Sequence, residues 1–207
     1  MHKVLVLYYS RHGAVASLAK EVGYGIETVD GCEAVMRTVP SVSTVCEATE
    51  PAIPEKGDVH ARKENLEDCQ ALVLGSPTRF GTIASPLKYF FDQTASEWLA
   101  GTLVDKPAGV FTSSSSMHGG QESTLLSMML PLIHHGMIVV GIPYTGSPIG
   151  NTQTGGTPYG ASHVGGPDNI RPVDNDEKMA ARILGRRVAN CARLVAKSAL
   201  LPTGYSR

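Results

Sequence analysis

The stretch KVLVLYYSRHGAVASLAKEVGYGI, residues 3–26, passes directly from an apolar run into a helical pattern. Its first seven residues carry continuous rather than alternating hydrophobicity, which is typical of a parallel strand covered on both faces. Its second part repeats apolar side chains at helical spacing, at Val15, Leu18, Ala19, Val22 and Ile26. Because the strand turns into the helix through Ser10 and Gly13, the stretch predicts the first β-α unit of an α/β fold.

Similar apolar runs recur at residues 33–39, 71–76, 108–113 and 137–142. Five such strands alternating with helical patterns predict a doubly wound parallel sheet. Residues 40–65 and 143–175 follow neither pattern and are longer than ordinary α/β connections. Loops of that size are typically lids, oligomer contacts or disordered segments. Nothing in the chain indicates a domain boundary, so we expect one domain over residues 1–207.

Three more helical patterns follow. One covers residues 85–98 and opens with Ser-Pro, which fits an N-cap residue followed by a first-turn proline. The next covers residues 125–133, where Pro131 should kink or shorten the helix. The last begins at Asp174, with Glu177 three residues later in the pattern of a capping box.

Composition and charge exclude several classes of function. The chain has 207 residues, of which 42% are hydrophobic, and its formal net charge of −1 gives no broad positive field for nucleic acid. No apolar run approaches the roughly 18 residues of a membrane span. The six-residue run Val4–Tyr9 is also shorter than the roughly 7 to 15 residues of a secretory signal. We therefore expect a soluble cytoplasmic protein without a membrane segment.

The four cysteines, Cys32, Cys46, Cys69 and Cys191, are widely spaced and form no C-x-x-C pair. No Cys/His cluster has zinc-ligand spacing, so no metal site is expected. Reduced thiols, most of them small hydrophobic core residues, are the interpretation that we favour.

Two loops leave expected strands at the carboxyl edge, where open parallel sheets bind ligands. Residues 8–19 offer a small hydroxyl, free amides and a helix N-terminus, which suit a phosphate; an ordinary capped turn is the alternative. They match neither a P-loop nor a Rossmann fingerprint. Residues 75–94 contain prolines and glycines that can present backbone groups to a flat heterocycle, with Phe80 as an apolar wall. The alternative there is a rigid turn with Phe80 in the core.

A third loop, TSSSSMHGG at residues 112–120, has the composition of a flexible linker. It nevertheless joins an expected strand to an expected helix of the same sheet. Its small residues therefore favour an ordered loop whose backbone approaches a ligand closely.

These motifs together resemble one known family. VLVLYYSRHG, GSPTRFGTIASPLKYFFDQT, FTSSSSMHGGQEST, HHGM and GGTPYGAS occur in the order of the flavodoxin-like WrbA family, which comprises FMN-dependent NAD(P)H:quinone oxidoreductases. The likeness covers nearly the whole chain. It implies a flavodoxin-like sheet of strand order 2-1-3-4-5 with an extra segment around the fifth strand. It also implies a homotetramer, with residues 143–175 at a subunit interface.

The resemblance implies a site as well. FMN would have its phosphate at Ser10–Val15 and its ring edge along Thr78–Phe80. His12 would also contact the nicotinamide, and Trp98 would line the quinone pocket. The family commonly carries Tyr-Gly-His-Ile where this chain has His12-Gly13-Ala14-Val15. The full set of implied FMN contacts is Ser10, Arg11, His12, Gly13, Ala14, Val15, Thr78, Arg79, Phe80, Gly81, Ser113, Ser114, Ser115, Ser116, Met117, His118, Gly119 and His134.

The implied activity is a ping-pong transfer of two electrons from NADH or NADPH to FMN and then to a quinone. No protein side chain acts as a nucleophile, because the cofactor carries the chemistry. The expected donors near the flavin ring are the amides of residues 78–81 and His134. Two alternatives stay open: a one-electron carrier, and a non-enzymatic interaction protein on the same fold. A net charge of −1 disfavours the carrier, since such carriers are usually strongly acidic.

Overall fold

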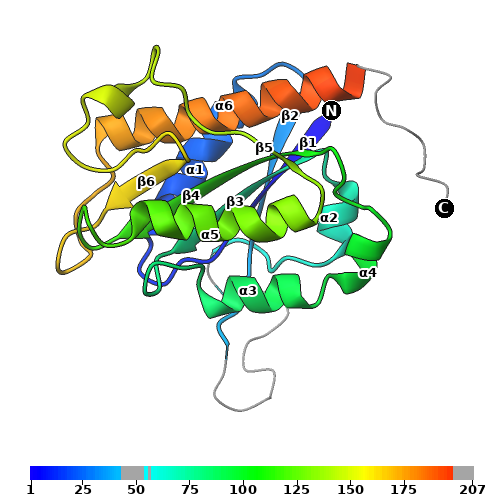
Figure 1. The fold of residues 1–207 in the computed structure, drawn as a ribbon, viewed down its shortest axis with the longest axis horizontal. Coiled ribbons are helices and arrows are strands. Elements are labelled where there is room, and N and C mark those ends of the chain that lie inside the picture. The colour runs from blue at the N-terminus through cyan, green and yellow to red at the C-terminus, as the bar shows by residue number, and fades with distance from the viewer. Residues whose placement is uncertain (43–53, 56, 198–207) are drawn as a thin grey trace.

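The computed structural model describes residues 1–42, 54–55 and 57–197. Its centre is a parallel sheet in the order β2-β1-β3-β4-β5 (Figure 1). The strands are β1 (His2–Tyr8), β2 (Cys32–Thr38), β3 (Ala71–Pro77), β4 (Pro107–Ser114) and β5 (Ile138–Val139). This is the flavodoxin-like strand order that the motifs imply, so the predicted fold class is confirmed.

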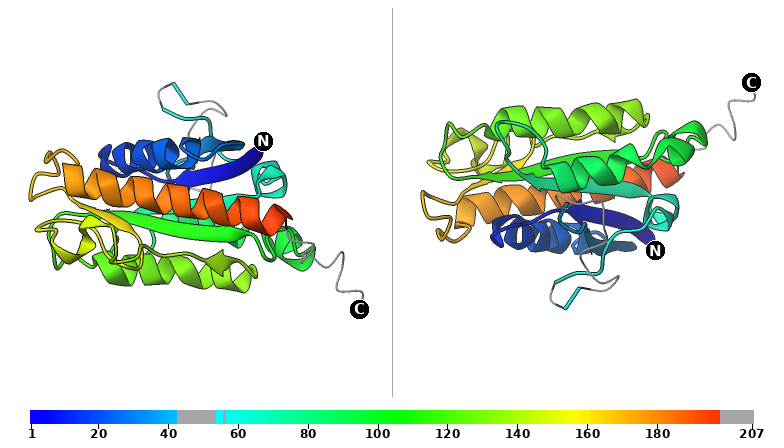
Figure 2. Two further views of the ribbon diagram at one scale, coloured as in Figure 1. Left: turned by 90° about the horizontal axis from the view of Figure 1, so that it is seen from above. Right: turned by 90° about the horizontal axis from the view of Figure 1, so that it is seen from below.

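Helices cover both faces of the sheet (Figure 2). One face carries α1 (Ala14–Glu27) and α6 (Asn175–Lys197), and the other carries α3 (Ser85–Asp92) and α5 (Gln121–His134). The short helices α2 (Glu64–Asp68) and α4 (Ala95–Leu99) lie at the end where β1 begins (Figure 1). Alternate residues of β1 belong to two separate hydrophobic cores. Val4 and Val6 pack on the α1/α6 side, and Leu5 and Leu7 pack on the α3/α5 side. Burial on both faces explains the continuous apolar runs.

Helices α1 and α6 approach each other at two glycines. A Cβ on Gly25 would lie 2.1 Å from the carbonyl oxygen of Arg182, and one on Gly185 would lie 2.1 Å from that of Val22. Any side chain at either position would hold the helix backbones apart. The contact therefore fixes the loop that enters α1 relative to the segment that enters α6.

The expected fifth strand is divided. β5 pairs with the first two residues of β4, whereas β6 (Ala161–Val164) pairs with residues 111–114 at its other end. Between them runs the extra segment, which contains the short 3₁₀ helix η1 (Pro148–Gly150). Our expectation that residues 143–175 contain no strand is wrong. β6 reads Ala-Ser-His-Val and has no apolar run, so its strand conformation depends on pairing with β4.

Two expected helices also differ. Residues 85–98 form α3 and α4 instead of one helix, because the Thr94 hydroxyl donates to the carbonyl of Phe91 where α3 ends. The N-cap of α3 is Ala84 and its first helical residue is Ser85. The predicted N-cap, Ser85, is therefore one residue too late in the sequence. α5 continues past Pro131 to His134 and is not shortened. Pro131 lies in the last turn, where it removes one helical hydrogen bond and little helix has to follow it.

The cysteines in the described residues are free thiols. Cys32 and Cys69 are buried, as expected, and Cys191 is partly buried. Burial raises the pKa of Cys69 to about 11, which keeps this thiol protonated at neutral pH. Cys46 lies outside the described residues. In the described ranges, no helix is long and apolar enough to cross a membrane.

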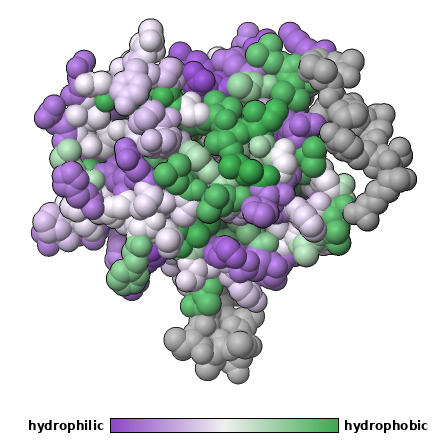
Figure 3. Space-filling model, in the orientation of Figure 1, coloured by the Kyte–Doolittle hydropathy of each residue, from purple (hydrophilic) through white to green (hydrophobic). Residues whose placement is uncertain are grey.

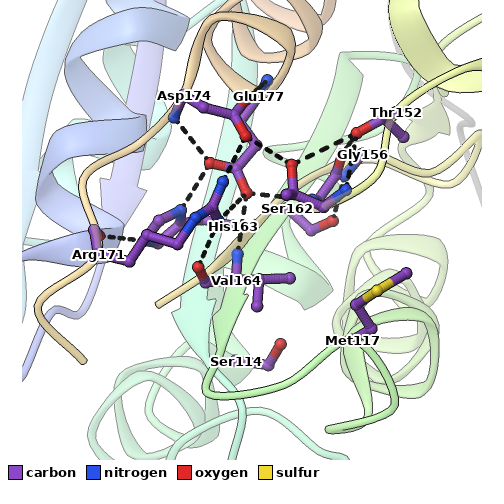
Figure 4. Close-up of polar contacts among 12 residues, drawn as sticks. Ser114, Met117, Thr152, Gly156, Ser162, His163, Val164, Arg171, Asp174 and Glu177 are labelled. Atoms are coloured by element: carbon purple, nitrogen blue, oxygen red, sulfur yellow. Dashed lines mark hydrogen bonds and ion pairs between the residues drawn. The ribbon is translucent and has the colours of Figure 1, made fainter. Parts of the chain in front are cut away.

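A buried carboxylate fixes the start of α6. Asp174 Oδ1 accepts from the amide of Glu177, and Glu177 Oε2 accepts from the amide of Asp174, each at 2.9 Å, which confirms the predicted capping box. The Glu177 side chain has no exposed surface. It also accepts from the amides of Gly155 and Val164, at 3.0 Å each, and contacts His163 Nδ1 at 2.7 Å (Figure 4). One carboxylate thus joins the extra segment, β6 and α6.

The pKa of Glu177 makes the stability of this junction dependent on pH. Burial alone would raise that pKa, but hydrogen bonds from His163 and from the amides of Asp174 and Val164 outweigh burial and lower it to about 2. A carboxylate whose pKa is lowered by folding stabilises the fold fully at pH values above its unfolded pKa of 4.5. This contribution is lost as the pH falls towards 2.

We expect the free energy of unfolding, measured by urea titration, to fall steadily between pH 4.5 and 2. Glu177→Gln should remove much of that dependence and destabilise the protein at pH 7 by about 3 kcal/mol, because it breaks a buried charged network. Glu27→Gln, a change of the same kind at an exposed position, should keep the wild-type pH profile. An identical pH slope in the wild type and Glu177→Gln would contradict this account.

Candidate functional site

Three loops meet where β1, β3 and β4 end. They comprise residues 9–13, 78–84 and 115–120, and they surround a cavity of about 120 Å³. This is the carboxyl edge at which the sequence places the cofactor loops. The cavity is lined by Ser10, Arg11, His12, Ala14, Val15, Pro77, Thr78, Arg79, Ser113, Ser114, Ser115 and Asn169. Ten of these twelve residues belong to the predicted groups Ser10–Val15, Thr78–Gly81 and Ser113–Gly119; Pro77 and Asn169 do not.

 

The ten predicted residues come from all three predicted groups. Five of the ten belong to the group Ser10–Val15, two to Thr78–Gly81 and three to Ser113–Gly119. The remaining predicted loop residues, Gly13, Phe80, Gly81 and residues 116–119, lie in the same loops but do not line the cavity.

The first loop has the features of an anion site. Ser10 Oγ accepts from the first-turn amide of Ala16 at 3.2 Å, whereas the N-cap of α1 is Gly13, with a left-handed φ of 89°. Within the described residues, the amides of Ala14 and Val15 have no acceptor. Free first-turn amides and the helix dipole attract a negative group such as a phosphate.

The second loop contains a tight turn that exposes an aromatic ring. Arg79 and Thr82 exchange backbone hydrogen bonds at 3.0 and 3.1 Å, and Phe80 and Gly81 between them have φ values of 52° and 78°. Two positive φ values define a type I′ turn. The Phe80 side chain is fully exposed, so the alternative that placed it in the core is wrong. Such a backbone costs a bulky residue about 1–3 kcal/mol and is typical of functional sites.

Most amides of this second loop are already engaged. Thr78 donates to the carbonyl of Ser113 at 2.9 Å, and Gly81 donates to Thr78 Oγ1 at 3.3 Å. Arg79 donates within the turn. Of the amides at 78–81, that of Phe80 alone has no acceptor in the described part of the chain. Of the four amides that we expected to donate to the flavin ring, only that of Phe80 is therefore free to do so.

The third loop is ordered. Ser114 Oγ donates to the carbonyl of Ser116 at 2.7 Å, and the amide of Gly119 donates to the same carbonyl at 3.1 Å. A Cβ on Gly119 would lie 3.0 Å from that oxygen, so a larger residue would crowd the turn. Across the described ranges, the amides of residues 115–118 find no acceptor. They are backbone donors available to a ligand at the rim.

Trp98 and His134 lie together, but away from the cavity. Trp98 Nε1 donates to the carbonyl of His134 at 2.7 Å, and both residues line a groove of about 440 Å³ beside α4 and the end of α5. In Figure 1 this end of α5 lies where the strands begin, opposite the three loops. Within a single chain, Trp98 and His134 therefore do not reach the cavity.

Asn169 lines the cavity but was not predicted. It lies in the segment between β6 and α6, and Ser115 Oγ donates to its Oδ1 at 3.0 Å. The sequence GGPDNIRP around it indicates turns, and Asn tolerates the left-handed φ of 55° found here. Its approach to the cavity depends on the pairing of β6 with β4, which the sequence pattern did not predict.

Known proteins are similar to this chain in sequence and in fold. A family model described as NADPH-dependent FMN reductase matches residues 3–152, which include all three loops. A relative from Solidesulfovibrio magneticus, named NAD(P)H dehydrogenase (quinone), is 42% identical over 202 residues, covering 92% of this chain and 97% of its own. A relative of the same name from Geobacter sulfurreducens is 41% identical over 198 residues, covering 91% and 97%.

Among solved structures, a WrbA-like flavodoxin from Agrobacterium tumefaciens superposes with a TM-score of 0.63 at 22% identity, covering 94% of this chain and 99% of its own. That likeness supports the flavodoxin-like fold. The family model and the relatives go further, because they match the sequence over most of its length. The chain therefore belongs to the NADPH-dependent FMN reductase family, and the resemblance that its motifs indicate is confirmed.

Proposed function

We propose that the protein is an FMN-dependent NAD(P)H:quinone oxidoreductase in which NAD(P)H and the quinone occupy one open site in turn. The observation that carries this proposal is the cavity at the carboxyl edge, where three loops present backbone amides that have no acceptor in the described residues. The names of the relatives and the description of the family model support the same activity.

The residues of the cavity fit FMN. The amides of Ala14 and Val15 would hold the phosphate at the N-terminus of α1. Phe80 and the amides of residues 115–118 would contact the ring at the rim. When bound, FMN supplies hydride acceptance and two-electron delivery, so no nucleophilic side chain is required.

The protein contributes binding, orientation and access. A cavity of about 120 Å³ is smaller than the pockets that enclose whole drug-sized ligands, so it suits the phosphate end while the ring stays at the open rim. The exposed side chain of His12 at that rim is the proposed nicotinamide contact. The free amides of residues 115–118 would stabilise negative charge on a bound flavin ring.

The proposed assembly is a homotetramer. Figure 3 shows an apolar patch on the face that carries α5, where Leu126, Leu130 and Ile133 are 46%, 61% and 56% exposed. Contiguous apolar patches of this kind mark interaction surfaces. Contact through this face would allow the groove of Trp98 and His134 to border a neighbouring subunit's cavity and complete the quinone pocket. The proposal places the enzyme in the cytoplasm, where NAD(P)H is available.

The activity is tested with purified protein, FMN, NADH or NADPH, and benzoquinone. We expect FMN to bind and the quinone to be reduced, with parallel lines in double-reciprocal plots because the two substrates share one site. Intersecting lines would contradict the shared site. Accumulation of a long-lived one-electron form without turnover would favour a carrier, and a protein that FMN titration leaves unchanged would contradict the proposal altogether.

Phe80 offers a second test, because its backbone is strained while its ring is exposed. Phe80→Asn should raise the free energy of unfolding by about 1 kcal/mol, since Asn tolerates a left-handed φ. It should also weaken FMN binding, since the apolar wall is lost. Phe80→Ala should weaken FMN binding equally without the gain in stability. Unchanged FMN affinity in both variants, measured by fluorescence titration, would exclude a contact between Phe80 and the ring.

The assembly is tested by light scattering. Wild-type protein should have four times the chain mass of 21.9 kDa. Leu130→Glu places a charge in the apolar patch and should reduce both the mass and quinone turnover. Leu194→Glu, at an equally exposed leucine on α6, should change neither. A monomeric wild type with full activity would contradict the tetramer.

A further inference from the structure

The segment between β6 and α6 adds a fourth wall to the cavity. None of the predicted FMN contacts lies in this segment, and the family model ends at residue 152. Asn169 nevertheless lines the cavity together with Ser10, His12 and Thr78. A polar side chain placed there is within reach of a group bound in the cavity.

Asn169 belongs to a segment that leads into α6, which packs on the same face of the sheet as α1. The first loop enters α1 and the segment around Asn169 enters α6, and these two helices pack on the same face of the sheet (Figure 2). The turn that exposes Phe80 leads instead to α3 on the opposite face. Asn169 shares the small cavity with Ala14 and Val15, whose amides are free, and its side chain accepts a hydrogen bond from Ser115.

The hydrogen bonds of Asn169 orient its amide group. Its Oδ1 accepts from Ser115 Oγ at 3.0 Å, which leaves the two N–H groups of Nδ2 as donors. In the described residues, Nδ2 has no recorded acceptor. The backbone amide of Asn169 donates to Gly166 at 3.1 Å, which holds the residue at its left-handed φ of 55°. A free donor pair thus belongs to the same cavity as the free amides of Ala14 and Val15.

The buried network holds this segment in place. Arg171 Nη1 donates to the carbonyl of Val164 at 2.6 Å and to Glu177 Oε1 at 3.2 Å (Figure 4). Arg171 also pairs with Asp174, and His163 Nε2 lies 3.0 Å from the carbonyl of Arg171. Both ends of the short loop that carries Asn169 are therefore fixed to β6 and α6.

We propose that Asn169 recognises the phosphate of FMN and that Arg171, through its contacts with Val164 and Glu177, is a positioning residue for it. The site thereby selects the phosphomonoester of the flavin over the unphosphorylated flavin. This inference rests on the proposed function, because it concerns the same cofactor site. The two neutral N–H donors of Asn169 would add to the amides of α1 in binding the doubly charged phosphate.

The test compares the dissociation constants of FMN and riboflavin by quenching of flavin fluorescence. Asn169→Asp places a carboxylate against the phosphate, so FMN affinity should fall by about tenfold or more. Riboflavin affinity should change by less than about twofold, since riboflavin has no charge there. Asn175→Asp makes the same substitution at an exposed position outside the cavity and should leave both constants unchanged.

If Asn169→Asp weakens the binding of FMN and riboflavin equally, or weakens neither, the assignment of Asn169 to the phosphate is overturned. The proposed function would still stand if the wild type binds FMN and reduces quinone. A wild type that binds neither flavin would overturn both.

The role of Arg171 is tested by the ratio of the dissociation constants of riboflavin and FMN. A general loss of stability does not change this ratio. Arg171→Gln should lower the preference for FMN in the wild-type background and leave it unchanged in an Asn169→Ala background. An equal effect in both backgrounds would show that Arg171 does not act through Asn169.

Discussion

The buried carboxylate of Glu177 is the interaction on which the carboxyl edge depends. A charge without exposed surface is stable only when donors surround it, and Glu177 has them from His163, Arg171 and three backbone amides. Displacing any of these donors would leave an interior charge under-compensated. The extra segment, β6 and α6 are consequently held together, and the fourth wall of the cavity is held with them.

The cavity relies on backbone more than on side chains. Its free amides come from three loops that a parallel sheet brings to one edge, and its small residues let those amides reach a ligand. Two residues with left-handed backbones, Phe80 and Asn169, belong to different segments of this arrangement. The strained backbone of Phe80 is consistent with a site that orients a cofactor and leaves the chemistry to it.

The sequence predicts the regular parts well because their signals are local. Apolar runs locate the first four strands, and the spacing of Asp174 and Glu177 locates the start of α6. Features that depend on tertiary contacts were missed: β6 has no apolar run, and Asn169 reaches the cavity only because β6 pairs with β4. Motif resemblance grouped Trp98 and His134 with the cofactor loops, whereas in one chain they lie at the other end of the strands.

Hydrogen exchange of the backbone amides, with and without FMN, tests the central claim most directly. If the free amides of the loops hold the cofactor, FMN should slow exchange at Ala14, Val15 and residues 115–118. The amides of Thr78 and Gly81, which are already bonded, should change little. Protection that is absent from the first group, or that appears only around Trp98 and His134, would contradict the account.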